Sequence, residues 1–199
     1  MSIQEEKEGL QERDMARTPV DIKPSPKGRL SKEMAIYVLL DKLEIPYLRV
    51  DHEAAATVDD CQGVDEALGI HICKNLFLCN RQKTDFYLLM MPGLKKFKTK
   101  ELSAQLGVAR LSFAGAEYME EFLHITPGSV SVMGLMNDRE HRVRLLIDRE
   151  LLQDEFVGCH PCVNTSSLKL RTKDVLEKFL PYVEHDYTVV ELAGEAALI

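Results

Sequence analysis

The chain has 199 residues, of which 45% are hydrophobic and 29% charged, and its formal net charge is −7. This length suits one domain, or one domain with a tail, and permits a sizeable buried core. No run approaches the roughly 18 apolar residues that would span a membrane, and the charged N-terminus has no apolar core typical of a secretory signal. We therefore expect a cytoplasmic protein without a membrane partner. The net negative charge also disfavours non-specific binding to DNA.

The cysteines are odd in number, at Cys61, Cys73, Cys79, Cys159 and Cys162. A disulfide framework is more typical of a shorter secreted chain with an even count. We therefore expect mainly reduced thiols.

Residues 1–30 mix charges with prolines and have no sustained apolar period, which predicts a flexible arm or a loosely docked extension. The folded domain is expected at 31–199. Its first helix begins at Ser31 and is predicted to end before Pro46, and a short strand follows. Thr57, followed by Asp60, resembles a capping box that opens a second helix.

Helices and strands then interleave along the chain. Two apolar runs, 72–79 and 86–91, flank a polar turn and predict a β-hairpin. Further strands are expected at 110–113, 129–136, 142–147, 167–170 and 188–192, the second and third of these joined by a turn at 137–140. Further helices are expected at 101–106, 117–123 and from Thr172 to Leu180. Because several strand pairs are hairpins, the pattern favours a mixed α/β domain over a doubly wound parallel sheet.

Lys74 is unusual because it lies inside an apolar strand. Period-2 alternation puts it on the same face as Ile72, Leu76 and Leu78. If that face is buried, the ammonium needs an anionic partner or a ligand. The alternative is a lysine at the strand end that extends to water.

A turn precedes the next β-rich run, in the segment Thr126-Pro127-Gly128-Ser129-Val130-Ser131. Glycine permits backbone conformations closed to other residues, and such a turn can present N–H groups to an oxyanion or a phosphate. A plain structural turn is the alternative.

A histidine, an asparagine and hydroxyls crowd into the loop around Cys159, His160, Cys162, Asn164 and Thr165. A redox pair would need its first thiol at a helix N-terminus, and the residues that follow look like loop and strand. A zinc site would need about two further ligands. A polar structural loop is the third interpretation.

A run of lysines, Lys95, Lys96, Lys98 and Lys100, offers a local positive patch in a negatively charged chain. An enzyme that holds only the end of an RNA needs no more than such a patch. A solvated surface segment is the alternative.

Taken together, the ordered motifs resemble those of a known family. They are Lys74-Asn75-Leu76-Phe77-Leu78, Pro127-Gly128-Ser129-Val130-Ser131, Gly134-Leu135-Met136-Asn137-Asp138, and His160-Pro161 with Asn164-Thr165. From about residue 32 to 192 the chain resembles the YbaK/ProX superfamily, or prolyl-tRNA synthetase associated domain, and within it the stand-alone ProX/PrdX branch. The resemblance implies a mixed α/β fold around a curved, barrel-like sheet.

It also implies hydrolysis of mischarged tRNA, most of all removal of alanine from proline tRNA, without a metal or organic cofactor. The expected partners are the acceptor end of mischarged proline tRNA and prolyl-tRNA synthetase. A catalytically silent RNA-end-binding or regulatory protein on the same fold is the alternative, followed by a thiol-redox or zinc protein.

The resemblance carries roles over to individual residues. Lys74 is expected to bind the terminal phosphate or polarise the ester, with Asn75 and the N–H groups around Gly128 orienting the aminoacyl group. His160 is expected to position the terminal ribose or the attacking water. Substrate contacts are expected from Thr126, Pro127, Ser129, Ser131, Asn164 and Thr165, and tRNA contacts from Lys95, Lys96 and Lys98. The chain departs from many relatives at His124, Val132 and Cys162, where they often have Gly, Pro and a residue other than Cys.

Overall fold

The computed structural model describes residues 19–54 and 62–194. The strands are β1 (Tyr47–Asp51), β2 (Lys74–Cys79), β3 (Phe86–Met91), β4 (Ser112–Phe113), β5 (Val143–Asp148), β6 (Phe156–Cys159), β7 (Ser166–Arg171) and β8 (Tyr187–Val190). The α-helices are α2 (Ser31–Lys42), α3 (Gln62–Leu68), α4 (Thr99–Leu106), α5 (Ala116–Leu123), α6 (Thr172–Asp174) and α7 (Leu180–Tyr182). Two 3-10 helices, η2 (Val132–Asn137) and η3 (Arg149–Gln153), and a π-helical turn, η4 (Val175–Phe179), complete the described elements.

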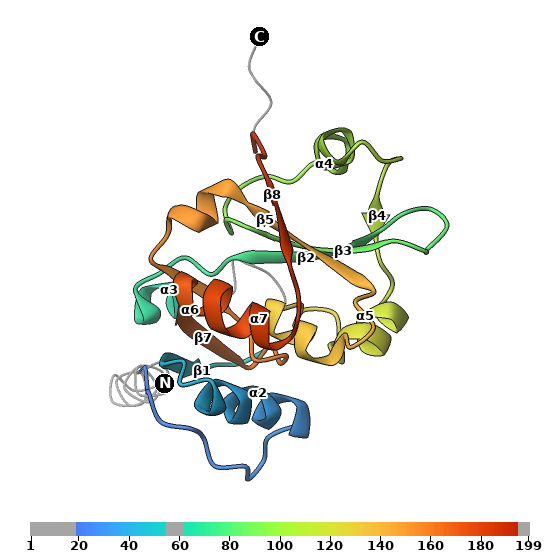
Figure 1. Ribbon diagram of the computed structural model, residues 1–199. Coiled ribbons are helices and arrows are strands. Elements are labelled where there is room, and N and C mark those ends of the chain that lie inside the picture. Colours follow the sequence, from blue (N-terminus) through green and yellow to red (C-terminus); the bar gives the residue numbers. More distant parts are fainter. Residues whose placement is uncertain (1–18, 55–61, 195–199) are drawn as a thin grey trace, which may run out of the picture.

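The described strands form two sheets, which confirms a mixed α/β fold (Figure 1). The larger has the order β4-β2-β3-β5-β8, and the smaller has the order β1-β7-β6. The predicted hairpin is confirmed, since β2 pairs antiparallel with β3. The main core lies where the sheets and helices meet, with Tyr37 of α2, Phe77 of β2 and Phe179 of η4 fully buried in one cluster.

The expected barrel-like closure is wrong for the part of the chain described. The strands β6 and β7 pair with β1 instead of continuing the larger sheet. Outside the named strands, an isolated bridge between Ile72 and Gly158 links the segment before β2 to the smaller sheet.

The strand predicted at 129–136 is also wrong, and so is its hairpin with 142–147. The hydroxyl of Ser131 accepts a hydrogen bond from the N–H of Met133 and caps the 3-10 helix η2. Gly134 packs within η2 so closely on Leu123 that an added Cβ would lie 3.0 Å from the Leu123 Cβ atom. Strand β5 instead pairs in parallel with β3, and β8 pairs in parallel with β5.

Two smaller differences concern single elements, and one prediction cannot be compared. The helix expected from Thr172 to Leu180 is divided into α6, the π-helical turn η4 and α7, and the Thr172 hydroxyl at its start donates to the backbone oxygen of Asp154 at 2.6 Å. The short strand β6 has no counterpart in the predicted pattern. The capping box at Thr57 and Asp60 lies outside the described residues.

The segment 19–30 is docked on the domain. Val20 and Arg49 exchange backbone hydrogen bonds of 2.7 and 2.8 Å, and the guanidinium of Arg29 contacts Glu33 and Asp51. Within 19–54 and 62–194, no helix is long and apolar enough to cross a membrane.

Replacing Gly158 by alanine is expected to destabilise the junction between the sheets. The new Cβ would lie 2.8 Å from the Ile70 side chain and 3.0 Å from the Ile72 Cα atom, which is backbone and cannot rotate away. We expect a loss of about 1–3 kcal/mol in the free energy of unfolding, measured by urea denaturation. Gly115→Ala is the matched control, because the three atoms nearest to its Cβ all belong to the exposed, flexible carboxylate of Glu117. Equal stability of the two variants would contradict this account.

Candidate active site

The three predicted segments meet at the junction between the two sheets. The N–H and the thiol of Cys73 both approach the backbone oxygen of Gly158, at 3.1 and 2.9 Å. The hydroxyl of Ser131 donates to the backbone oxygen of His160 at 2.5 Å. The start of β2, the turn that contains Gly128 and the loop after β6 therefore lie side by side.

Asn75 presents a buried oxygen at this junction. Its amide nitrogen faces the Cys73 carbonyl at 3.4 Å, which can only accept, so this orientation of the amide is the consistent one. The oxygen Oδ1 is buried, and no described residue donates a hydrogen bond to it. A buried acceptor left unpaired costs about 1–3 kcal/mol, so this atom suits a donor from a ligand.

The loop after β6 holds His160 in one tautomer. Its Nδ1 lies 2.9 Å from the Ser166 carbonyl, which can only accept, so Nδ1 carries the proton and Nε2 keeps the lone pair. Burial lowers the pKa of His160 and a hydrogen bond to Ser166 only partly opposes it. The ring is therefore neutral near pH 7 and can accept a proton or a hydrogen bond through Nε2.

A second histidine, His52, lies beside it and was not predicted. The two ring centroids are 6.1 Å apart, and the Ser167 hydroxyl lies 2.9 Å from His52 Nε2 and 3.3 Å from His160 Nδ1. In the sequence, His52 is marked only by its position directly after a short predicted strand. The pairing of that strand, β1, with β7 brings it beside His160.

Behind His160, a partly buried polar network contacts the backbone that orients it. The Ser166 hydroxyl donates to the Asp51 carboxylate at 3.0 Å and lies 3.2 Å from the Tyr37 hydroxyl. Arg29 donates to the same carboxylate at 2.6 Å, and Arg49 also contacts it. Burial alone would raise the pKa of Asp51, but the hydrogen bonds from the two arginines outweigh it and hold that pKa below its usual value.

The polar side chains of the predicted turn at 126–131 stabilise the turn by hydrogen bonds to nearby backbone. Gly128 has φ of 85°, the left-handed region that favours glycine. The hydroxyl of Ser129 donates to the Thr126 carbonyl at 2.8 Å, and its N–H donates to the same oxygen at 3.0 Å. Ser129 and Ser131 are both buried, so these two hydroxyls shape the turn. Pro127 precedes the glycine, on the exposed part of the turn.

Lys74 lies on the opposite side of β2 from Asn75 and lines a groove of about 810 Å³. Its amine donates to the backbone oxygen of Lys95 at 3.0 Å. We call this groove the basic groove, since its described lining contains five cations and no carboxylate. It is lined by Lys74, Leu76, Lys96, Phe97, Lys98, Thr99, Lys100, Arg110 and Phe113.

Lys95 differs from the other lysines predicted to contact tRNA. Its ammonium lies 2.8 Å from both Asp148 and Glu150, and its side chain is only 9% exposed. Lys96 and Lys98 are exposed and line the basic groove. Lys95 is therefore neutralised within the fold, and the two other lysines remain available to an anion.

The cysteines of the loop are poor candidates for redox chemistry. Cys159 and Cys162 are buried free thiols, as are Cys73 and Cys79. Burial raises the pKa of Cys162 to about 12 and that of Cys159 well above its usual value, so the reactive thiolate is disfavoured. Asn164 and Thr165 continue the same loop, where the Thr165 carbonyl accepts the His52 N–H at 3.0 Å.

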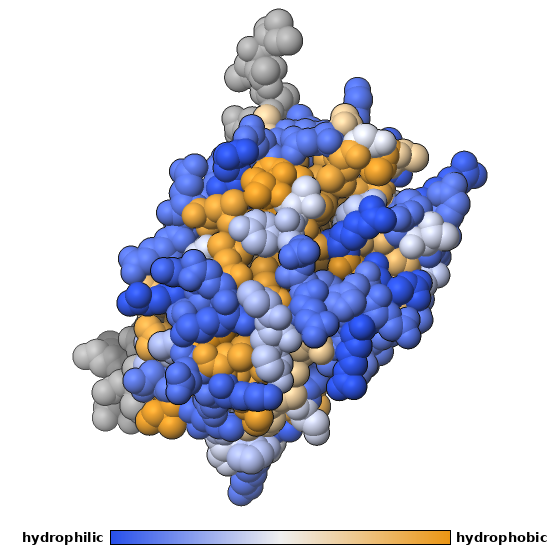
Figure 2. All heavy atoms as spheres, in the orientation of Figure 1, coloured by the Kyte–Doolittle hydropathy of each residue, from blue (hydrophilic) through white to orange (hydrophobic). Residues whose placement is uncertain are grey.

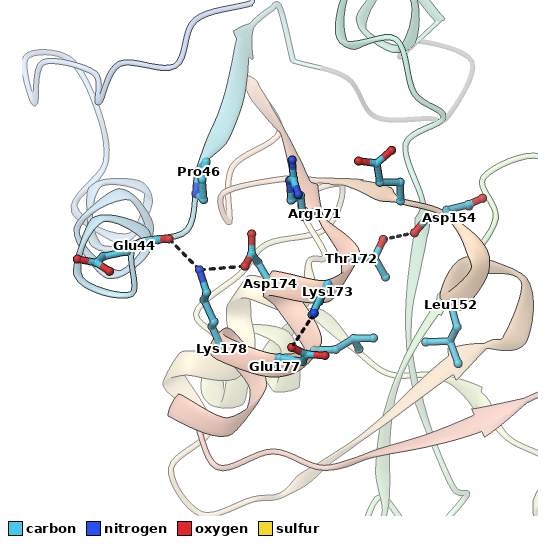
Figure 3. Close-up of a pocket in the computed structure, with 12 residues that line it drawn as sticks. Glu44, Pro46, Leu152, Asp154, Arg171, Thr172, Lys173, Asp174, Glu177 and Lys178 are labelled. Atoms are coloured by element: carbon cyan, nitrogen blue, oxygen red, sulfur yellow. Dashed lines mark hydrogen bonds and ion pairs between the residues drawn. The ribbon is translucent and has the colours of Figure 1, made fainter.

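Another hollow, of about 650 Å³, contains none of the predicted site residues (Figure 3). Its polar groups bond to one another: Lys178 to Asp174 at 3.0 Å and to the Glu44 carbonyl at 3.0 Å, and Thr172 to the Asp154 carbonyl. Ion pairs among exposed groups of this kind are common surface features. The basic groove and the junction at His160 are therefore the stronger candidates.

Replacing Asp51 by asparagine is expected to destabilise the fold at pH 7, because two arginines lose their carboxylate. We expect a loss of about 1–3 kcal/mol in the free energy of unfolding, measured by urea denaturation. The pKa of Asp51 is depressed below 3.8 in the folded state, so its stabilisation is present above that pH and lost as the pH falls through the folded value. The difference in the free energy of unfolding between Asp51→Asn and wild type should therefore be smaller at pH 3 than at pH 7.

Asp21→Asn, at an exposed position of the docked segment, is the control for Asp51→Asn. If Asp51→Asn matched this control at pH 7, the carboxylate would not hold the network together.

Comparisons with known proteins identify the family of this chain. Residues 52–178 match the aminoacyl-tRNA editing domain family. The chain is 29% identical over 163 residues to the prolyl-tRNA editing protein ProX of Acetoanaerobium sticklandii, covering 82% of this chain and 99% of that protein. It is 27% identical over 167 residues to prolyl-tRNA synthetase associated domain-containing protein 1 of Xenopus laevis, covering 82% and 97%.

The fold also resembles the crystal structure of a candidate trans-editing enzyme for prolyl tRNA synthetase. The TM-score is 0.64 at 15% identity, with 85% of this chain and 100% of that chain covered. At this identity the likeness concerns the fold alone, and the family is established by the match over more than half of the chain. This chain belongs to the aminoacyl-tRNA editing domain family.

Proposed function

We propose that this protein is a trans-editing aminoacyl-tRNA deacylase that hydrolyses the ester of mischarged tRNA, with alanine on proline tRNA as its main substrate. The observation that carries the proposal is the convergence of three segments at one junction, namely the start of β2, the Gly128 turn and the His160 loop. The similarity to the ProX editing protein over nearly all of that protein's length supports the same reaction.

The chemistry explains why such an enzyme is needed. A synthetase pocket built for proline cannot strongly reject a smaller amino acid, because a missing methylene is worth only about 1–3 kcal/mol. A second site that hydrolyses the wrong product removes the error. The ester is already activated, so orientation of water and stabilisation of the oxyanion suffice without a protein nucleophile.

The proposed reaction adds water to the ester carbonyl carbon and breaks the bond to the ribose oxygen, which takes up a proton. Nε2 of neutral His160 accepts a hydrogen bond from the attacking water or from the terminal ribose hydroxyl. Asn75 Oδ1 accepts from the α-amino group of the substrate. The N–H groups around Gly128 stabilise the developing oxyanion.

Lys74 is proposed to bind the terminal phosphate. It follows Cys73 at the junction, yet it points into the basic groove while Asn75 points to the other side of β2. The terminal nucleotide would thus cross the start of β2, with its phosphate on one side and its aminoacyl group on the other. A lysine amine suits this role because it is a compact, hydrated point charge.

Lys74→Ala is expected to lower deacylation of alanyl-proline tRNA by about 100-fold or more while the fold is retained. The measurement is release of labelled amino acid, with circular dichroism as the test of folding. Lys83→Ala, an exposed lysine in the β2–β3 turn, is the matched control. An undiminished rate in Lys74→Ala would remove this residue from the mechanism.

The substrate itself is tested with proline tRNA charged in parallel with alanine, cysteine, serine and proline. Alanine should be released fastest and proline hardly at all. Fast release of cysteine instead would change the proposed substrate but keep the reaction. If the wild-type protein bound each tRNA and hydrolysed none, the proposal would fail in favour of a silent binder of the RNA end.

The pH dependence tests the role of His160. Because burial lowers its pKa below 6.5, the ring should stay neutral as the pH falls through 6.5 and become protonated only at lower pH. We expect kcat/KM to fall as the pH drops through the pKa of His160. The variant His160→Gln should have low activity, and its kcat/KM should not show this acidic fall. An identical acidic limb in the variant would assign the titration to another group.

A further inference from the structure

A cationic groove with two aromatic rings lies beside the proposed active site. We infer that the basic groove binds the unpaired 3′ end of the RNA, with nucleotide bases on Phe113 and Phe97 and phosphates on the surrounding cations. This inference rests on the proposed function, since it names how the same substrate is held upstream of its ester.

Charge singles out this part of the surface. The chain carries a net charge of −7, yet the described lining of the groove combines five Lys and Arg residues with no Asp or Glu. Lys96, Lys98 and Lys100 are exposed and alternate along one segment, so their ammonium groups are free to face the groove. A groove lined by cations on a protein of net negative charge attracts phosphates to that groove.

The aromatic rings give the groove a second property. Phe113 is 61% exposed, although a phenylalanine normally gains by burial. Its ring lies 6.2 Å from that of Phe97 at an interplanar angle of 68°, so Phe97 supports it from the groove wall. Exposed rings between cations are typical of surfaces that bind single-stranded nucleic acid, because every base has a face to stack.

The remaining cation is held in the wall near these rings. Arg110 is exposed, and its Nε lies 3.4 Å from the Thr99 hydroxyl, which restrains the guanidinium. A guanidinium presents both a charge for phosphate and a planar face for a base.

The length of the groove fits a few nucleotides. Phe113 pairs with Leu78 across the β4–β2 ladder, and Leu78 is four residues from Lys74. Four residues of strand span about 13 Å. A stacked strand rises about 3.4 Å per nucleotide, so the groove accommodates about three to four nucleotides. The terminal nucleotide would lie at Lys74, next to Asn75, and the preceding ones would extend toward Phe113.

An apolar patch on the molecule is a weaker candidate for this contact. Figure 2 shows apolar side chains gathered over β8 and α4, with hydrophilic residues around them. Val189, in strand β8, is 37% exposed. Such a patch has no charge to attract a phosphate backbone, whereas the basic groove supplies charge and stacking together.

The first test is binding of a short single-stranded RNA with the 3′-terminal sequence of proline tRNA, followed by fluorescence anisotropy. Phe113→Ala should weaken binding about tenfold, since a stacked base is worth about 1–3 kcal/mol. The double variant Lys98→Gln, Arg110→Gln should show a weaker salt dependence. The slope of log Kd against the logarithm of the salt concentration should fall by about 0.7 for each cation removed.

The controls match these changes in chemistry but lie elsewhere on the surface. Tyr182→Ala removes an exposed ring from α7, and Arg81→Gln with Lys173→Gln removes two exposed cations. A polyglutamate peptide serves as the competing anion. Equal losses in the control and groove variants, or tighter binding of polyglutamate than of RNA, would overturn the inference.

A second measurement separates this inference from the proposed function. Phe113→Ala should lower kcat/KM for charged tRNA about tenfold but leave hydrolysis of 3′-alanyl-adenosine, which has no upstream nucleotides, unchanged. If the wild type hydrolysed charged tRNA and Phe113→Ala did so equally well, the groove assignment would be overturned while the deacylase proposal stood. If RNA bound with the expected losses but wild type hydrolysed nothing, the groove would stand and the deacylase proposal would fall.

Discussion

The geometry around His160 depends on the carboxylate of Asp51. That carboxylate receives hydrogen bonds from Arg29 and Arg49 on one side and from the hydroxyl of Ser166 on the other. The Ser166 backbone is thereby fixed, and its carbonyl selects the tautomer of His160. Because Arg29 lies in the docked segment ahead of α2, residues distant in sequence from the histidine support the contact that leaves the lone pair on its Nε2.

Strand β2 divides the proposed site into two environments with different physical properties. Alternation sends Lys74 and Leu76 toward the basic groove and the smaller core beneath α4, and it sends Asn75 and Phe77 toward the main core. One side therefore has an open groove lined by cations, and the other has a buried amide oxygen to which no described residue donates a hydrogen bond. The proposed reaction would use both environments, one for the phosphate and one for the ester, and consecutive residues of one strand would supply them.

The sequence predicts local features of this fold better than distant ones. The β2–β3 hairpin follows from two apolar runs and a polar turn, which are local. The parallel pairing of β5 with β3 joins segments more than fifty residues apart, and no local pattern encodes it. The apolar run 129–136 reads as a strand, yet the Ser131 cap and the close packing of Gly134 make it a 3-10 helix. His124 takes a left-handed conformation, φ 52°, at the end of α5, a conformation that the residue type alone does not predict.

The candidate site follows the same division between local and distant information. The ordered motifs identify Lys74, Asn75, Gly128 and His160, whereas His52 and Asp51 become apparent only when β1 is paired with β7. The lysine run shows that a count of charges does not tell which lysines are paired with carboxylates in the fold. Lys95 is neutralised by two carboxylates from β5 and η3, while Lys96 and Lys98 remain exposed. Five cations without a carboxylate in the described lining of one groove, on a protein of net charge −7, favour binding of phosphates at that groove.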